Sequence, residues 1–149
     1  MKSISRGPAA VTQERAAFTL DAALLGFVIA EHATARDVTP EWFRAPRWQH
    51  AAHALVRHRD TGGQLGDIIV AGAVLDAAGV PFPRSTAAEA VIAAQEAVPA
   101  VWLIRARERL VRLRLYRLGR RLKLIARADI DVIPAQVALV RDALGKVAA

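Results

Sequence analysis

The chain of 149 residues contains no cysteine, and only 5% of its residues are aromatic although 54% are hydrophobic. The absence of cysteine excludes disulfides, thiolate metal ligands and cysteine nucleophiles, and it is compatible with a reducing cytoplasm. The hydrophobic residues are mostly Ala, Val, Leu and Ile, of which Ala and Leu are strong helix formers. The composition therefore favours an all-α fold in a chain of single-domain size.

Long apolar runs are also missing. No stretch of 18 or more apolar residues is present, and the N-terminal sequence MKSISRGPAAVTQERAAF lacks the apolar segment of a secretory signal. We therefore expect a soluble, cytoplasmic protein that does not bind a membrane.

Negative charge is scarce in the last third of the chain. Residues 1–99 contain nine Lys or Arg and ten Asp or Glu, whereas residues 100–149 contain twelve and four. The whole excess positive charge, formally +7 for the chain, therefore lies in the last third.

No catalytic motif is present. His50 and His53 are separated by alanines, without the i, i+4 spacing and the intervening Glu of a zinc-binding helix. The segment 61–66 (TGGQLG) lacks the lysine of a phosphate-binding loop, and no serine lies in a Gly-x-Ser-x-Gly sequence. The acidic residues form no convincing general acid and base pair. We therefore expect no enzymatic activity, no metal site and no cofactor.

Start and stop signals divide the chain into helices. Helices are predicted over about 10–32, from Pro46 to Gly62, from Asp67 to Gly79, from a capping box of Thr86 with Glu89 to Pro99, over 100–127, and from Pro134 to 147. Thr39 with Pro40 predicts a short additional turn, and residues 80–83 predict a surface loop. Gly26 is expected to allow a close helix crossing.

These helices predict three regions. Residues 1–13 form a flexible tail, residues 14–98 form a small globular helical bundle, and residues 99–149 form a protruding two-helix hairpin. Trp42, Phe43 and Trp48 are expected to anchor the short turn in the core or in an interface, with ligand stacking as the alternative.

The helix over 100–127 has two contrasting sides at about 100° per residue. An apolar stripe consists of Val111, Leu115, Leu118, Leu122 and Ile125. If the opposite side is only solvated, this stripe is expected to pack against Val137, Val140 and Leu144 of the last helix. The opposite side is cationic around Tyr116 and contains Arg105, Arg109, Arg112, Arg120, Lys123 and Arg127. Only Glu108 offsets ten cations between residues 105 and 127, so salt bridges within the helix cannot neutralise this side. Either an acidic or phosphate-bearing partner binds the cations, or water solvates them.

The order of motifs resembles the N-terminal domain of DnaB-type replicative helicases. The resemblance covers about residues 14–147 and is carried by Leu25-Gly26, Pro40-Glu41-Trp42-Phe43, Pro46 to Leu55, Gly63 to Asp67, Leu75 to Gly79, and the two C-terminal helices. In that family the domain forms a collar above the motor ring, its hairpins pair subunits, and its surface docks primase. The resemblance implies interaction and not catalysis, because the ATPase domain has no counterpart in this sequence. The Pro-rich loop 80–85 and the basic helix depart from the family pattern.

Two hypotheses follow. In the first, the protein associates with itself as a dimer or hexamer through the hairpin, by way of Val111, Leu115, Leu118 and Leu122, and it binds a replication partner, which is primase, the replicative helicase or its loader. In the second, the cationic side of the long helix binds DNA through its phosphates.

Overall fold

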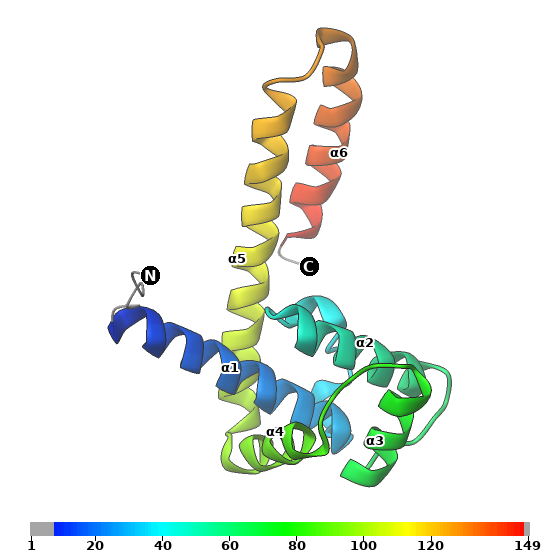
Figure 1. Cartoon of the computed structure of the whole chain (residues 1–149). Helices are drawn as coiled ribbons and strands as arrows, with labels where there is room; N and C mark the ends of the chain where they lie inside the picture. The colour runs from blue at the N-terminus through cyan, green and yellow to red at the C-terminus, as the bar shows by residue number, and fades with distance from the viewer. Residues whose placement is uncertain (1–7, 148–149) are drawn as a thin grey trace, which may run out of the picture. The chain divides into compact units, whose positions relative to one another are not determined.

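The computed structural model describes the backbone of residues 8–147 and the side chains of residues 19–147. The helices are α1 (Pro8–Ile29), η1 (Ala33–Ala35), η2 (Pro40–Trp42), α2 (Pro46–Asp60), α3 (Ile68–Ala77), α4 (Arg84–Glu96), α5 (Pro99–Ile125), η3 (Ile130–Val132) and α6 (Ile133–Lys146) (Figure 1). No strand occurs within residues 8–147, which confirms the all-α prediction.

The chain divides into two compact units, Met1–Ala106 and Arg107–Ala149. The division falls inside α5 and not at residue 99, because the first turns of this helix belong to the first unit, where Ala106 is completely buried. The predicted tail was too long: α1 begins at Pro8, so residues 8–13 are helical, and residues 1–7 lie outside the described part of the chain.

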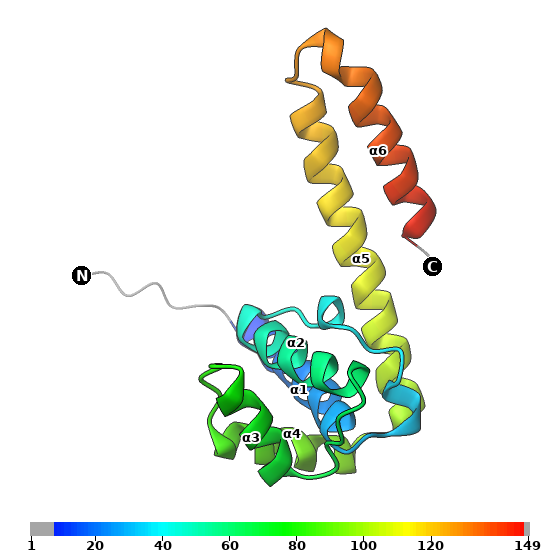
Figure 2. The same ribbon diagram turned by 90° about the vertical axis from the view of Figure 1, so that its right-hand side faces the viewer.

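The core of the first unit is built on α1 and α4, which lie side by side in both ribbon views (Figure 2). Leu24, Leu25, Phe27 and Val28 of α1 are almost completely buried. Gly26 lies where the backbones meet, because an added Cβ atom would overlap the carbonyl oxygen of Ala90. The prediction that Gly26 permits a close crossing is therefore confirmed, whereas the side chain of Phe18 lies outside the described residues.

The aromatic cluster belongs to the core. Trp42, Phe43 and Trp48 are 7%, 0% and 3% exposed, so packing and not ligand stacking explains them. Just before α2, the backbone N–H groups of Arg44 and Ala45 donate to the buried carboxylate of Asp21, at 3.3 and 3.2 Å. A side chain from α1 thus fixes the two residues that lead into α2.

Two local predictions around α4 were wrong. The helix begins at Arg84, so Thr86 lies inside its first turn, where its buried hydroxyl accepts from Arg47 at 3.4 Å instead of capping the helix. The loop 80–83 does not lie wholly on the surface either. Phe82 is 8% exposed and packs edge-on against Trp48, with 5.3 Å between the ring centroids. Apolar contact with a distant helix therefore fixes this loop, and local turn signals do not show it.

The second unit is a helical hairpin. The C-terminal part of α5 and α6 run antiparallel side by side and are joined through η3, as both views show (Figures 1 and 2). The guanidinium of Arg114 ties the helices together by donating to the carbonyl oxygen of Lys146 at 3.0 Å. Pro134 lies in the first turn of α6, as predicted.

Candidate interaction surfaces

The seam between α5 and α6 is only partly apolar. The side chains of α6 that are not exposed are Ile133, Gln136, Val140 and Ala143, and Val147, directly after the helix, is buried as well. Their alternating spacing of three and four residues is that of a helix packed along one neighbour. On α5 the facing positions include Arg114, Leu118, Arg121 and Ile125. Arg114, Arg121 and Gln136 are polar, Ala143 is short, and Arg121 is exposed, so apolar contacts make up only part of the seam.

The predicted apolar stripe is therefore split between two surfaces. Leu118 is 9% exposed and belongs to the seam, which corrects its assignment to an oligomer interface. Leu115 and Leu122 are 48% and 50% exposed, and Val111 is half-buried. On α6, Val140 lies in the seam as predicted. Val137 and Leu144 do not, because they are 43% and 57% exposed.

The four exposed residues lie on one side of the hairpin. Leu115 and Leu122 each follow a seam position of α5 by one residue, and Val137 and Leu144 each follow a seam position of α6 by one residue. One residue turns a helix by about 100°. All four residues are therefore turned from the seam by the same angle in the chain direction. Because the two helices run antiparallel, this turn places all four side chains on the same side of the hairpin. We call Leu115, Leu122, Val137 and Leu144 the apolar side of the hairpin.

These residues also lie level with one another. Leu122 is three residues before the end of α5 and Val137 four residues after the start of α6, while Leu115 and Leu144 are ten and eleven residues from the same ends. At about 1.5 Å of rise per residue, Leu122 lies opposite Val137 and Leu115 opposite Leu144. The apolar side thus consists of two cross-helix pairs, about two helical turns apart.

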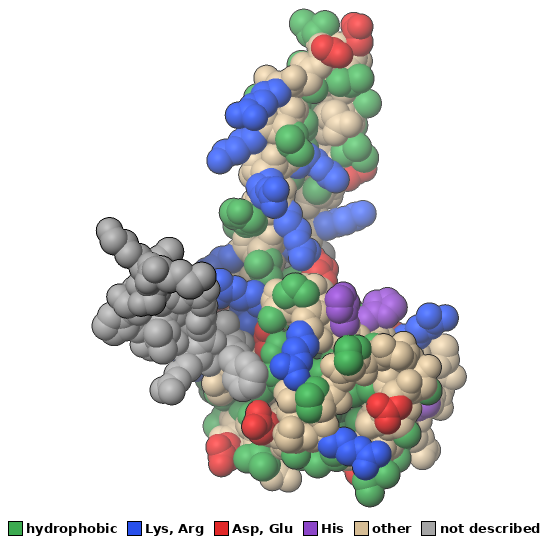
Figure 3. Space-filling model, viewed as in Figure 1, with side chains coloured by type: hydrophobic (Ala, Val, Ile, Leu, Met, Phe, Trp, Pro, Cys, Tyr) green, Lys and Arg blue, Asp and Glu red, His purple; other side chains and the backbone are tan. Residues whose placement is uncertain are grey.

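The cationic side of α5 points away from α6. Three of its predicted members, Arg112, Arg120 and Lys123, are exposed and lie about 120° to 180° around the helix from the seam. Arg127 is also exposed but lies in the turn that follows α5. None of these four cations forms an ion pair within the described residues. Arg109 is half-buried, and Arg105 belongs to the first unit, where its guanidinium lies 5.7 Å from the ring centre of Trp102. Lysine and arginine side chains follow the visible edge of α5 in Figure 3. Within the second unit, the structure thus brings together fewer exposed cations than the sequence predicts.

Histidine side chains gather over α2 (Figure 3). His50 and His53 are exposed, and the Nε2 atom of His58 lies 3.1 Å from the carbonyl oxygen of Gln64. In the described part of the chain, no group of three or more His, Asp or Glu residues is placed to hold a metal ion.

An open groove of about 640 Å³ separates α2 from α3. One wall is polar and includes His50, His53 and Arg57, and the other is apolar and includes Val70, Ala73 and Val74. No Asp or Glu lines this groove. We call it the α2–α3 groove. Sequence analysis missed it, since it forms between helices separated by a loop.

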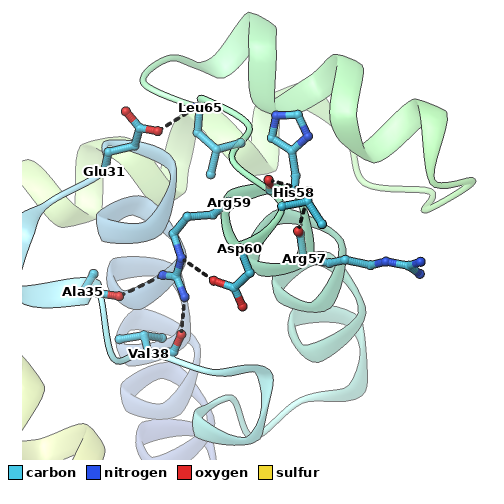
Figure 4. A network of polar contacts seen from close by, with 9 residues as sticks. Glu31, Ala35, Val38, Arg57, His58, Arg59, Asp60 and Leu65 are labelled. Carbon is cyan, nitrogen blue, oxygen red and sulfur yellow. Dashed lines mark hydrogen bonds and ion pairs between the residues drawn. The ribbon is translucent and has the colours of Figure 1, made fainter.

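A polar network holds the connections around the end of α1 (Figure 4). Glu31 has a φ of +54°, a conformation that favours glycine, and its carboxylate accepts from the backbone N–H of Leu65 at 2.8 Å. Arg59 donates to the carbonyl oxygens of Ala35 and Val38 at 3.1 and 3.3 Å. The Glu31 bond holds the loop that follows α2 at the end of α1, and the Arg59 bonds hold residues 35–38 against α2. Sequence analysis missed both residues.

In the described residues, no single helix is long and apolar enough to cross a membrane, although α4 and α5, which are bent by 114° at their junction, pass a test of length and composition as a pair. No known protein family, curated protein or solved structure matches the chain.

Proposed function

We propose that this chain is a non-catalytic interaction protein of DNA replication, similar to the N-terminal domain of DnaB-type helicases, which associates with itself through its hairpin and binds primase, helicase or loader. The observation that carries self-association is the apolar side of the hairpin. Four apolar side chains, each 43% to 57% exposed, face the same way in two level pairs. Leaving such a surface in water is unfavourable, and a second copy of the same surface would bury it around a twofold axis.

The link to replication rests on the ordered motifs, several of which have a packing or capping role in the first unit. Leu25 is buried and Gly26 lies at the crossing of α1 with α4. The carboxylate of Asp67 caps α3 by accepting from the N–H of Val70 at 2.8 Å, and Gly79 ends this helix with a φ of +69°. These packing and capping roles are the support for the proposed resemblance.

Light scattering in line with size exclusion tests self-association. We expect the unaltered chain to form a dimer or hexamer and Leu144→Asp to lower the mass, because a carboxylate in the centre of the interface would be desolvated. Leu139→Asp is the matched control: Leu139 lies on the same helix and is 48% exposed, but it lies on the other side of the seam. A monomeric unaltered chain, or equal masses for both variants, contradicts the proposal.

The replication partner needs a separate measurement. We expect the self-associated protein to shift in mass when it is mixed with the primase, the replicative helicase or the helicase loader of the same organism. If none of the three produces a shift, the protein lacks the proposed partner, whatever its oligomeric state.

The alternative is a nucleic-acid-binding protein, and the cationic side of α5 favours it. Four exposed cations without an ion pair in the described residues would neutralise several phosphates and give affinity that falls steeply with salt. Binding of generic duplex and single-stranded DNA is measured across salt concentrations. Two triple variants that change the net charge equally are compared. One combines Arg112→Glu, Arg120→Glu and Arg127→Glu, and the control combines Arg36→Glu, Arg44→Glu and Arg84→Glu. No affinity at low salt, or equal losses for the two triple variants, would remove this alternative.

A further inference from the structure

The polar wall of the α2–α3 groove is a regular row on one helix. His50, His53 and Arg57 recur at i, i+3 and i+7, so they project from one side of α2. This side is opposite the buried residues Ala51, Leu55 and the other core positions of α2, and all three side chains of the row are exposed. The row therefore has no part in the core.

The facing wall is apolar although it lies at the surface. Ala73 is exposed, and Val70 and Val74 are half-buried along the groove. Beside them on α3, Ile69 is 77% exposed, which leaves a large aliphatic side chain in water. A ligand that fits this wall must bring apolar groups of its own.

The two walls together select one class of ligand. We infer that the α2–α3 groove binds an amphipathic helix of a partner protein, whose aliphatic side chains lie on α3 and whose Asp or Glu side chains face His50, His53 and Arg57. Arg57 supplies a positive charge, His50 and His53 supply ring N–H donors, and no acid among the lining residues opposes a carboxylate. An open apolar groove suits the helix-in-groove mode of recognition.

A nucleic acid fits the groove less well. Of the lining residues only Arg57 has a permanent positive charge, which is little for a polyanion. The apolar wall would also face a phosphate backbone without a hydrogen-bond donor. The inference concerns the first unit alone, so it holds whether or not the hairpin mediates self-association.

Two matched synthetic peptides test this inference against the full chain. Both are amphipathic helices of about 18 residues with leucine at i, i+3, i+4 and i+7, and one has glutamates along the polar edge where the other has lysines. Binding is followed by isothermal titration and by amide chemical shifts. We expect the glutamate peptide to bind more tightly and to shift amides of α2 and α3. Equal affinities, or shifts confined to other helices, would overturn the inference.

Variants of the chain locate the binding. His53→Glu with Arg57→Glu should raise the Kd of the glutamate peptide by about tenfold, because two carboxylates of the groove would then face the glutamates of the peptide. Arg44→Glu with Arg36→Glu is the control, since both side chains are exposed and neither lines the groove. Ala73→Trp fills the groove from an exposed position and should abolish binding without changing the melting temperature. Unaltered binding in either groove variant would overturn the inference.

Two further measurements distinguish peptide binding in the groove from self-association and from nucleic-acid binding. Leu144→Asp, which should prevent self-association, is expected to bind the glutamate peptide with unaltered affinity. A single-stranded oligonucleotide should not displace the peptide. Displacement with the same amide shifts would show that the groove recognises nucleic acid and not an acidic helix.

Discussion

Gly26 of α1 lies against Ala90 of α4 so closely that an added Cβ atom would overlap the Ala90 carbonyl oxygen and lie 2.6 Å from the Cβ atom of Ala94. Both partners come from another helix, about 64 residues away along the chain, and Ala90 is completely buried. The crossing of α1 with α4 therefore depends on a missing side chain as much as on the apolar residues around it.

Gly26→Ala should destabilise the first unit. The methyl group would force α1 and α4 apart, and overpacking of this kind costs about 1 to 3 kcal/mol. Thermal unfolding followed by circular dichroism measures the effect. Gly119→Ala is the control, because a Cβ atom at this α5 glycine has no neighbour within 4 Å and alanine is the better helix former. If Gly26→Ala melts at or above the temperature of the unaltered chain, the close crossing is not required.

Asp21→Asn should destabilise the start of α2. The carboxylate is 1% exposed and accepts from Arg44 and Ala45, and an amide is a weaker acceptor that also brings two donors into a buried site. We expect a loss of about 1 to 3 kcal/mol in the free energy of unfolding, measured by chemical denaturation. Asp37→Asn, at an exposed position, should change it little. Equal effects of the two variants would show that Asp21 does not stabilise the entry to α2.

The strained backbone at Glu31 allows a comparison of two variants. Glu31→Ala and Glu31→Gly both lose the hydrogen bond to Leu65, but only glycine adopts a φ of +54° without strain. Glu31→Gly should therefore be about 1 kcal/mol more stable than Glu31→Ala in the same denaturation experiment. An alanine variant as stable as the glycine variant would show that the left-handed conformation is not kept.

Leu118→Ala and Leu122→Ala should separate the seam from the apolar side. Leu118 is 9% exposed, so its truncation should lower the stability of the hairpin by about 2 kcal/mol and speed hydrogen exchange in residues 107–147. Leu122 is 50% exposed, so its truncation should weaken self-association and leave monomer exchange nearly unaltered. The reverse pattern would restore Leu118 to the interface.

The hairpin shows why the sequence predicted the helices better than their contacts. Apolar residues of α5 centre on a stripe through Leu115, Leu118 and Leu122, and this stripe points between the seam and the apolar side. The observed seam is rotated toward Arg114 and Arg121. Because these side chains are polar, the spacing of apolar residues along α5 does not indicate the seam. The regular spacing of Val140, Ala143 and Val147 in α6 is the signal that would have located it.

In the first unit, too, the sequence predicted helix ends better than contacts between distant segments. Pro46 and Asp67 mark helix starts that the structure confirms, because a proline or a capping carboxylate acts within one turn. Thr86 was wrongly taken for a cap, since its hydroxyl is held by Arg47 from another helix, 39 residues away. Phe82 was placed on the surface for a similar reason, because Trp48 lies far from it in sequence.

The sequence alone determined that the protein is all-α, where most of its helices begin and end, and that its positive charge gathers in the last third. These properties depend on interactions between residues one to four positions apart, which can be read along the chain. Only the tertiary structure decided which helix sides meet, which leucines remain exposed, and that α2 and α3 enclose a groove with one polar and one apolar wall. Those properties depend on side chains brought together from distant segments, where a rotation of a helix by one residue exchanges buried positions for exposed ones.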